Sequence, residues 1–433
     1  MIRDKKKSIS LLVITLSYVL TVTLIFSGLY TIMKKNTQTG AQNTTDKFTD
    51  VPTADHLSTK STPVTAIWIA TVGNIDYPTK QAMSAPALAL ELDKIIENAL
   101  RLGADTIFFQ VRPSGDALYQ SDIFPYSAYV SGVRGVAADG GFDSLRYLTD
   151  KAHASGISLH AWINPTRLLS GSTDRSLLCD TEAGALHPEW VVEYGGSLYY
   201  DPGIPEVRNL IADGIYEITS RYDVDGVVFD DYFYPYPTKD SSGNIIPFDD
   251  ALSYKKYGGS LSLDEFRRES VRSLVRVSGI AAKKGRSSAQ FGVSPFGIWK
   301  NEIFEGGSGT SGLEAYYDIW CDTLSFAREG SVDYIAPQLY WEIGYKDADF
   351  LTLAAWWSDA LSGTGAKYIP CLAPYRYKEG RYSTGEISRQ LEFLSTLPSC
   401  SGVALYGYSA LCDSALSVGY EVEAYTAKLK SKN

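Results

Sequence analysis

The chain has 433 residues, of which 45% are hydrophobic and 12% aromatic, and this is enough to bury a large core in one α/β barrel with insertions or in two ordinary domains. The net charge of −10 argues against a nucleic-acid partner, because phosphate binding needs a basic stripe and the body of the chain has none. Thirty tyrosines and eight tryptophans are mostly expected in the core, although aromatic rings also line clefts that bind sugars or apolar ligands.

The N-terminal segment has the pattern of a membrane anchor. Arg3 and three lysines at 5–7 precede residues 8–33, which contain no charged residue and exceed the ~20 residues that a membrane helix needs. The basic cluster predicts that the N-terminus lies inside the cell and the rest of the chain outside. Residues 1–35 are therefore predicted to be a cytoplasmic basic tip with a transmembrane helix, and cleavage as a long signal peptide is the alternative. Residues 36–62, rich in Thr, Asn, Gln and Ser, are predicted to be a flexible tether.

Residues 63–433 alternate between strand and helix patterns. The predicted strands are 64–72, 106–113, 158–165, 225–229, 289–297, 332–341, 367–375 and 402–411. The predicted helices are 86–102, 143–155, 205–222, 264–284, 313–328, 349–361, 386–397 and 414–429. Eight strand–helix units in one chain predict an α/β fold, a (β/α)8 TIM barrel.

The connections differ in length according to their direction. Helix-to-strand links are short, whereas the strand-to-helix links 114–142, 166–204, 232–263 and 298–312 are long. In such barrels the loops after the strands build the active site at the C-terminal face. The functional site is therefore predicted at that face.

Alternation along the predicted strands assigns side chains to the barrel interior, since residues two apart point the same way. The sets are Phe108, Gln110 and Arg112; His160, Trp162 and Asn164; Gly226, Val228 and Asp230; and Ala336, Gln338, Tyr340 and Glu342. Their last members are predominantly polar, whereas the opposite faces are mainly Ile, Val, Phe and Leu. These polar side chains are predicted to meet at the C-terminal end of the barrel.

Several segments carry a resemblance to a known family. They are Trp-Ile-Ala-Thr-Val-Gly-Asn-Ile-Asp (68–76), Phe-Gln-Val-Arg-Pro (109–113), Gly-Asp-Ala-Leu-Tyr (115–119), His-Ala-Trp-Ile-Asn-Pro (160–165), Asp-Pro-Gly (201–203), Asp-Gly-Val-Val-Phe-Asp-Asp-Tyr-Phe-Tyr-Pro (225–235), Ser-Pro-Phe-Gly-Ile-Trp (294–299) and Pro-Gln-Leu-Tyr-Trp (337–341). In this order they resemble the glycosyl hydrolase-like family 10, also catalogued as domain of unknown function 187. The resemblance implies a bacterial envelope protein with a glycosidase-type barrel, and relatives are associated with peptidoglycan glycan strands.

Glycoside hydrolysis generally uses two carboxyl groups on opposite sides of the scissile bond. The run Asp-Gly-x-x-Phe-Asp resembles the fourth strand of retaining barrel glycosidases, which implies that Asp230 is the nucleophile. Asp231 is adjacent in an extended segment and is expected to point the opposite way, so it is assigned to orienting Asp230 or binding a sugar hydroxyl. Glu342, at the end of the sixth strand, is the predicted general acid/base, with Asp76, Asp116, Asp231 and Glu302 as rivals.

The remaining predicted site residues would hold the sugar. Gln110, Arg112, Asn164 and Gln338 are assigned to hydrogen bonds with hydroxyl or acetamido groups, and Arg112 could instead pair with Asp230. Trp162, Trp299, Tyr232, Tyr340 and Trp341 are candidate stacking platforms, although Trp341 has the opposite parity. No cofactor and no metal are predicted, because no histidine pair has the spacing of a metal site.

The sequence thus predicts a single-pass protein of the bacterial cell membrane. Its extracellular barrel would hydrolyse a polysaccharide, a peptidoglycan glycan or a related aminosugar polymer. One alternative is a carbohydrate-binding barrel without turnover, favoured if no second carboxyl lies within about 10 Å of Asp230. Another is a substrate-assisted chitinase-like enzyme, which needs a glutamate where this chain has Tyr232.

Overall fold

The computed structural model describes Lys47 and residues 63–431. The predicted membrane anchor at 1–35 lies outside these residues, as does the predicted tether at 36–62 apart from Lys47. Within the described part, no helix combines the length and apolarity needed to cross a bilayer.

A parallel sheet forms the centre of the fold. Its strands are β1 (Val64–Ile69), β2 (Thr106–Arg112), β3 (Ser158–Ile163), β7 (Gly226–Phe229), β8 (Gln290–Val293), β9 (Tyr334–Ile335), β10 (Lys367–Tyr368), β11 (Cys371–Leu372) and β12 (Gly402–Leu405). Their order is β10-β9-β8-β7-β3-β2-β1-β12-β11. Since β10 pairs with β9 and β11 pairs with β12, the single segment 367–372 reaches both ends of this order. The parallel strands therefore curve round as in a barrel.

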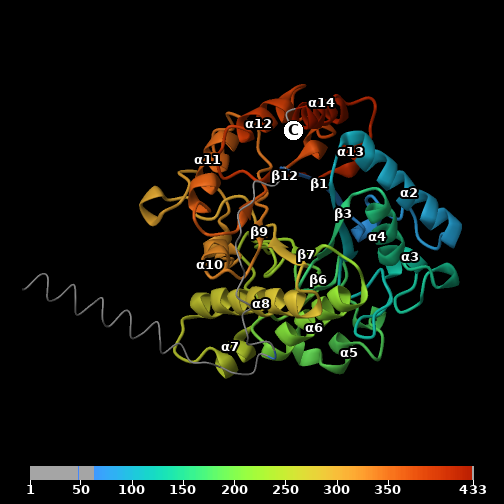
Figure 1. Cartoon of the computed structure of the whole chain (residues 1–433). Helices are drawn as coiled ribbons and strands as arrows, with labels where there is room; N and C mark the ends of the chain where they lie inside the picture. Colours follow the sequence, from blue (N-terminus) through green and yellow to red (C-terminus); the bar gives the residue numbers. More distant parts are fainter. Residues whose placement is uncertain (1–46, 48–62, 432–433) are drawn as a thin grey trace, which may run out of the picture. The chain divides into compact units, whose positions relative to one another are not determined.

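Helices surround the strands on the outside (Figure 1). The longer ones are α2 (Ala85–Leu102), α4 (Ser144–Ala154), α6 (Pro205–Arg221), α8 (Leu263–Gly285), α11 (Phe350–Ala360), α12 (Glu386–Leu394) and α14 (Val418–Lys430). Local signals explain several of their ends. Pro205 occupies the first turn of α6, where a missing N–H costs nothing, and a capping box of Ser262 with Glu265 starts α8. Gly103, with φ +71°, ends α2 in the left-handed conformation that glycine adopts freely.

The long loops carry additional structure. Segment 166–204 contains a small antiparallel sheet in the order β4-β6-β5, formed by β4 (Arg167–Leu169), β5 (Val191–Tyr194) and β6 (Ser197–Tyr200). Short helices are α3 (Ala128–Ser131), α5 (Ala183–Leu186), α7 (Ala251–Tyr257), α9 (Ala315–Asp318), α10 (Thr323–Arg328) and α13 (Tyr408–Leu411). Short 3-10 turns are η1 (Val72–Asn74), η2 (Asp139–Gly141), η3 (Arg175–Leu177), η4 (Pro188–Trp190), η5 (Ile303–Glu305) and η6 (Pro374–Tyr377).

Several predicted elements were wrong in part, and the strands predicted at 332–341 and 367–375 are reduced to β9 and to the separate β10 and β11. The predicted helix 313–328 is interrupted between α9 and α10, where Trp320 has φ +50°. The Trp320 ring packs 4.1 Å from the Arg267 guanidinium and its Nε1 donates to Asp264 at 2.8 Å, so tertiary contacts override helical periodicity there. The predicted strand 402–411 ends at Leu405, because Gly407 with φ +112° turns the chain into α13.

The inward-facing side chains form their own core. This inner cluster contains Ala66, Trp68, Ala70, Phe108, Trp162, Val228, Tyr334, Ala336, Ile369, Cys371 and Ala404. It confirms the alternation predicted for Phe108, Trp162, Val228 and Ala336. His160 is buried there and its Nδ1 lies 2.8 Å from the Tyr334 hydroxyl, while burial lowers its pKa to about 4.

Arg112 is the exception to the predicted alternation. Gln110 pairs with Trp162, but Arg112 pairs with Ile163, so a β-bulge lies between Gln110 and Arg112. The extra residue of the bulge reverses the direction of the side chains after it, so Arg112 points toward the helix layer. There its Nη2 donates to the Pro165 carbonyl at 3.0 Å and its guanidinium lies 4.1 Å from the Phe124 ring. The predicted pairing of Arg112 with Asp230 was therefore wrong.

Candidate active site

A cavity of about 210 Å³ lies at the C-terminal ends of the strands. Its lining residues are Trp68, Trp162, Asp230, Asp231, Tyr232, Tyr236, Ser294, Gln338, Tyr340 and Tyr406. A second cavity of about 250 Å³ includes Val64, Thr106 and Ser158, the first residues of β1, β2 and β3. Because active sites of barrels lie at the C-terminal face, the first cavity is the candidate active site.

Asp230, directly after β7, is held by three hydrogen-bond donors. Trp162 donates its Nε1–H to Oδ2 at 3.2 Å, and the Asn164 side-chain amide donates to the same oxygen. The backbone N–H of Tyr232 donates to Oδ1 at 3.3 Å. Burial raises the pKa of Asp230, while the nearby Arg167 cation and these donors act in the opposite direction. The cation and the donors therefore offset part of the desolvation that raises the pKa of Asp230.

Gln110 orients the side chain of Asn164. Its Nε2 donates to Asn164 Oδ1 at 2.5 Å, which directs the amide N–H of Asn164 toward Asp230. Its Oε1 accepts from the backbone N–H groups of Thr71 and Val72 at 2.7 and 2.8 Å. Neither Gln110 nor Asn164 lines the cavity, so both position Asp230.

Asp231 lies in the same cavity but has a different environment. It accepts a hydrogen bond from the Tyr236 hydroxyl, and Gln338 is a further donor. Burial and the neighbouring Asp230 charge raise its pKa. The expectation that the two aspartates point to opposite sides was wrong, because β7 ends at Phe229 and strict alternation ends with it.

Arg167 is a charged side chain near the two aspartates, and the sequence did not reveal its place there. It belongs to β4, its guanidinium lies 4.2 Å from the Tyr232 ring, and its Nη1 donates to the Pro113 carbonyl at 3.1 Å. Its charge favours the ionised form of both Asp230 and Asp231. The small β4-β6-β5 sheet that positions it was not predicted from the sequence.

Trp299 and Glu342 do not line the cavity. Trp299 is 8% exposed, and its Nε1 donates to Asp322 at 3.1 Å, so its ring is packed. Glu342 is half-buried, and its backbone carbonyl accepts from Tyr345 at 3.2 Å. The structure therefore brings together Asp230, Asp231, Trp162, Tyr232, Gln338 and Tyr340 from the predicted set.

The other predicted carboxyl rivals also lie away from the cavity lining. Asp76 accepts from the Ala70 backbone at 2.9 Å, Asp116 lies 3.4 Å from Arg134, and Glu302 is exposed.

Four residues that line the cavity were not among the site residues predicted from the sequence: Trp68, Tyr236, Ser294 and Tyr406. Trp68 is in β1 and points to the same side as the inward residues Ala66 and Ala70, two positions away, so the alternation rule could have found it. Tyr406 follows inward-facing Ala404 at the end of β12 by the same spacing. Tyr236 lies in the loop after β7, where no periodicity predicts direction.

The two aspartates predict a specific dependence of stability on pH. Their pKa values rise from the ordinary 3.8 to about 6 for Asp230 and about 7 for Asp231. The folded protein then binds more protons than the unfolded chain between these values, so the stabilising contribution is present at low pH and is lost as the pH rises through about 7. Asp231→Asn is expected to make the decline of the melting temperature across this window shallower.

Thermal unfolding across the window measures this difference. Asp249→Asn, which removes an exposed carboxyl from the loop that follows, is the matched control. Equal slopes for the wild type and Asp231→Asn would contradict the assignment.

Among residues 63–431, no group of three or more His, Cys, Asp or Glu side chains is arranged to hold a metal ion.

Solved structures with this fold include glycoside hydrolases. The glycoside hydrolase domain of PgaB (BpsB) from Bordetella bronchiseptica has a TM-score of 0.54 at 13% identity, over 84% of this chain and 98% of that domain. A β-galactosidase from Rahnella sp. R3 has a TM-score of 0.53 at 12% identity, over 86% of this chain and 57% of the enzyme. At such identities the likeness concerns the fold, which is the parallel α/β barrel type of glycoside hydrolases.

The sequence comparison then identifies the family. The profile of Glycosyl hydrolase-like 10 matches residues 63–380, and the chain belongs to this family. Glycosyl hydrolase YngK of Bacillus subtilis is 39% identical over 298 residues, which cover 68% of this chain and 57% of YngK. Glycosyl hydrolase DigH of Escherichia coli K12 is 34% identical over 373 residues, which cover 80% of this chain and 83% of DigH. The resemblance drawn from the motifs is confirmed.

Proposed function

We propose that this protein is a glycoside hydrolase that cleaves glycosidic bonds in a polysaccharide of the bacterial cell envelope, with the glycan strands of peptidoglycan as its substrate. The observation that carries the proposal is the pair of buried carboxyl groups, Asp230 and Asp231, in one aromatic-lined cavity at the C-terminal ends of the parallel strands. Membership of a glycosyl hydrolase-like family supports the reaction class.

The two carboxyl groups are assigned different roles because their surroundings differ. Three donors and a cation favour ionised Asp230, which serves as nucleophile or as the charge that stabilises an oxocarbenium-like transition state. Burial and the neighbouring Asp230 charge raise the pKa of Asp231 to about 7, so it can hold a proton near neutral pH and deliver it to the leaving oxygen.

Glu342 is the alternative proton donor, because it is half-buried and follows Tyr340, which lines the cavity, by two residues. The two assignments give different results. If Asp231 is the acid, Asp231→Asn lowers kcat by about 10²–10⁴-fold and removes the basic limb of the pH profile, whereas Glu342→Gln keeps that limb. The reverse result, from pH profiles of both variants, would assign the acid to Glu342.

The remaining cavity residues are assigned to holding one sugar. Gln338 offers a side-chain amide for a hydroxyl or acetamido group, while Trp162, Tyr232 and Tyr340 supply aromatic surface. We further propose that residues 1–35 anchor the protein in the membrane and that 36–62 tether the barrel outside it, which places the cavity beside the cell wall.

The direct test is hydrolysis by the full chain. Purified glycan strands, with and without their stem peptides, are incubated with the protein, and products are identified by mass spectrometry together with new reducing ends. Release of sugar fragments is expected. Binding of the strands without any release would favour the carbohydrate-binding alternative and contradict the proposed function.

A further inference from the structure

The candidate cavity is too small for a polymer. Its volume of about 210 Å³ lies below the ~300–1,000 Å³ typical of pockets for drug-sized ligands, so it can hold about one sugar ring. The neighbouring sugars of a glycan must therefore lie on surfaces outside the cavity.

An aromatic wall continues from one side of the cavity. The ring of Tyr236, which lines the cavity, lies 6.0 Å from Phe296, and Phe296 lies 5.6 Å from Trp341. Both Phe296 and Trp341 are only partly buried. A Cβ atom on Gly297 would approach Trp341 Cζ3 to 2.8 Å, so the indole lies directly on this backbone. The wall thus has a fixed ring and exposed aromatic surface.

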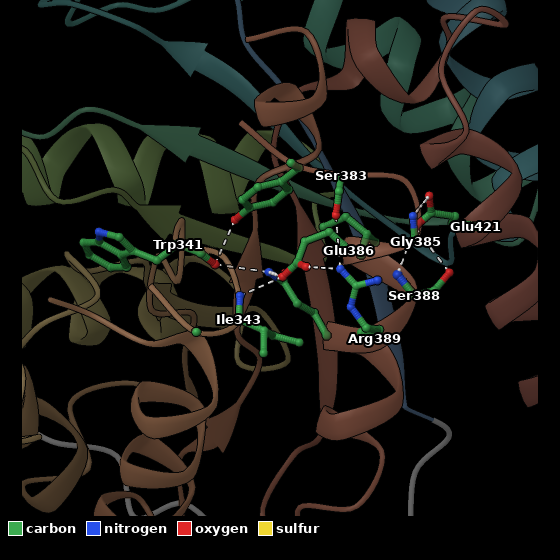
Figure 2. Close-up of polar contacts among 12 residues, drawn as sticks. Trp341, Ile343, Ser383, Gly385, Glu386, Ser388, Arg389 and Glu421 are labelled. Carbon is green, nitrogen blue, oxygen red and sulfur yellow. Dashed lines mark hydrogen bonds and ion pairs between the residues drawn. The ribbon is translucent and has the colours of Figure 1, made fainter. Parts of the chain in front are cut away.

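A polar cluster holds the backbone of Trp341 from the side opposite to its ring (Figure 2). Tyr382 Oη and Gln390 Nε2 donate to the Trp341 carbonyl at 2.9 and 3.1 Å. Glu386, 3% exposed at the start of α12, accepts from the Ile343 N–H at 2.8 Å and from Gln390 Nε2 at 2.9 Å. Figure 2 shows the indole of Trp341 directed away from this cluster.

We propose that Trp341, together with Phe296, forms a second sugar-binding subsite next to the cavity, and that Glu386 is a positioning residue for it. The proposal rests on the proposed function for its choice of ligand, an aminosugar chain. Flat aromatic surface binds the apolar faces of sugar rings without needing charge. Glu386 acts through the backbone of Ile343 and through Gln390, and it touches no substrate.

Trp341→Ala tests the subsite. The KM for long glycan strands is expected to rise about tenfold, with a much smaller change in kcat, because a lost stacking contact weakens binding. The increase should shrink for a substrate with a single N-acetylglucosamine ring, which cannot occupy both subsites. Tyr420→Ala, at an exposed tyrosine of α14, is the control. An equal KM for long strands in the wild type and Trp341→Ala would overturn the subsite.

Binding is also measured in the Asp230→Asn background, where no turnover interferes. Weaker binding of long N-acetylglucosamine oligosaccharides in the Asp230→Asn/Trp341→Ala double variant supports the subsite even if the wild type hydrolyses nothing. In that case the proposed function fails and the subsite stands.

The positioning role is tested with two variants of Glu386. Glu386→Ala removes the acceptor for the Ile343 N–H and should raise KM for long strands as Trp341→Ala does, whereas Glu386→Gln keeps a carbonyl oxygen there and should restore most of the affinity. Glu421→Ala is the matched control: Glu421 accepts from Gly385 and Ser388 at 3.0 Å, at the same end of α12 but without contacting 341–343 (Figure 2). An equal KM increase in Glu421→Ala would show that α12 stability, not the Ile343 contact, causes the effect and would overturn the role.

Discussion

Asp230→Asn is expected to reduce sugar release from glycan strands by about 10³-fold or more, which corresponds to ~4 kcal/mol of transition-state stabilisation. Asparagine has nearly the same shape, and its single carbonyl oxygen can still accept either from Trp162 and Asn164 or from the Tyr232 backbone. It has no negative charge to offer the developing cation of the sugar. Chemistry should therefore be lost while fold and binding persist.

The measurement combines product release, thermal unfolding and affinity for oligosaccharides. The wild type, Asp230→Asn and Asp249→Asn are compared, and the last removes an exposed carboxyl that no hydrogen bond ties to the cavity residues. Retained release in Asp230→Asn at a wild-type melting temperature would exclude Asp230 as the reacting carboxylate. A large fall in melting temperature would instead identify Asp230 as a structural group.

Regular alternation made much of the site predictable. In and directly after β3, Trp162 and Asn164 face inward as expected. Directly after β7, Asp230 faces the same side as Val228, which is two residues earlier and points inward. These residues lie in or directly after strands paired on both sides, where one face must enter the barrel and the other must contact helices. The hydrophobic pattern of the sequence is a direct consequence of that constraint.

The prediction fails where the chain departs from regular pairing. Arg112 follows a β-bulge, and a single extra residue sends its side chain to the opposite face. No periodicity in the local sequence predicts this bulge, beyond which Arg112 lies between Phe124 and the Pro165 carbonyl. The direction of Asp231 also differs from the one that alternation predicts, because it is set by the loop after β7 and by the hydrogen bond from Tyr236.

The largest expected effect on stability comes from Arg267 of α8. Its side chain is 6% exposed and forms two hydrogen bonds of 2.7 Å with Asp250, whose side chain is 2% exposed. It also donates to the Phe248 carbonyl at 3.1 Å and lies over the Trp320 ring. Arg267→Ala leaves the Asp250 charge buried without a partner, which is expected to cost about 3–5 kcal/mol in the free energy of unfolding.

Urea unfolding of three variants separates this effect from lost packing. Arg267→Met fills a similar volume, so it should be nearly as unstable as Arg267→Ala if the uncompensated charge of Asp250 is the cause. In that case the double variant Arg267→Met/Asp250→Leu should recover much of the lost stability. A double variant as unstable as Arg267→Met would contradict the electrostatic explanation.

The ion pair also bears on the active site, because Asp250 ends the loop 232–250 that brings Tyr236 to Asp231. Loss of Arg267 should therefore loosen the hydrogen bond that orients Asp231, and activity measured well below the melting temperature should fall in Arg267→Met and return in the double variant.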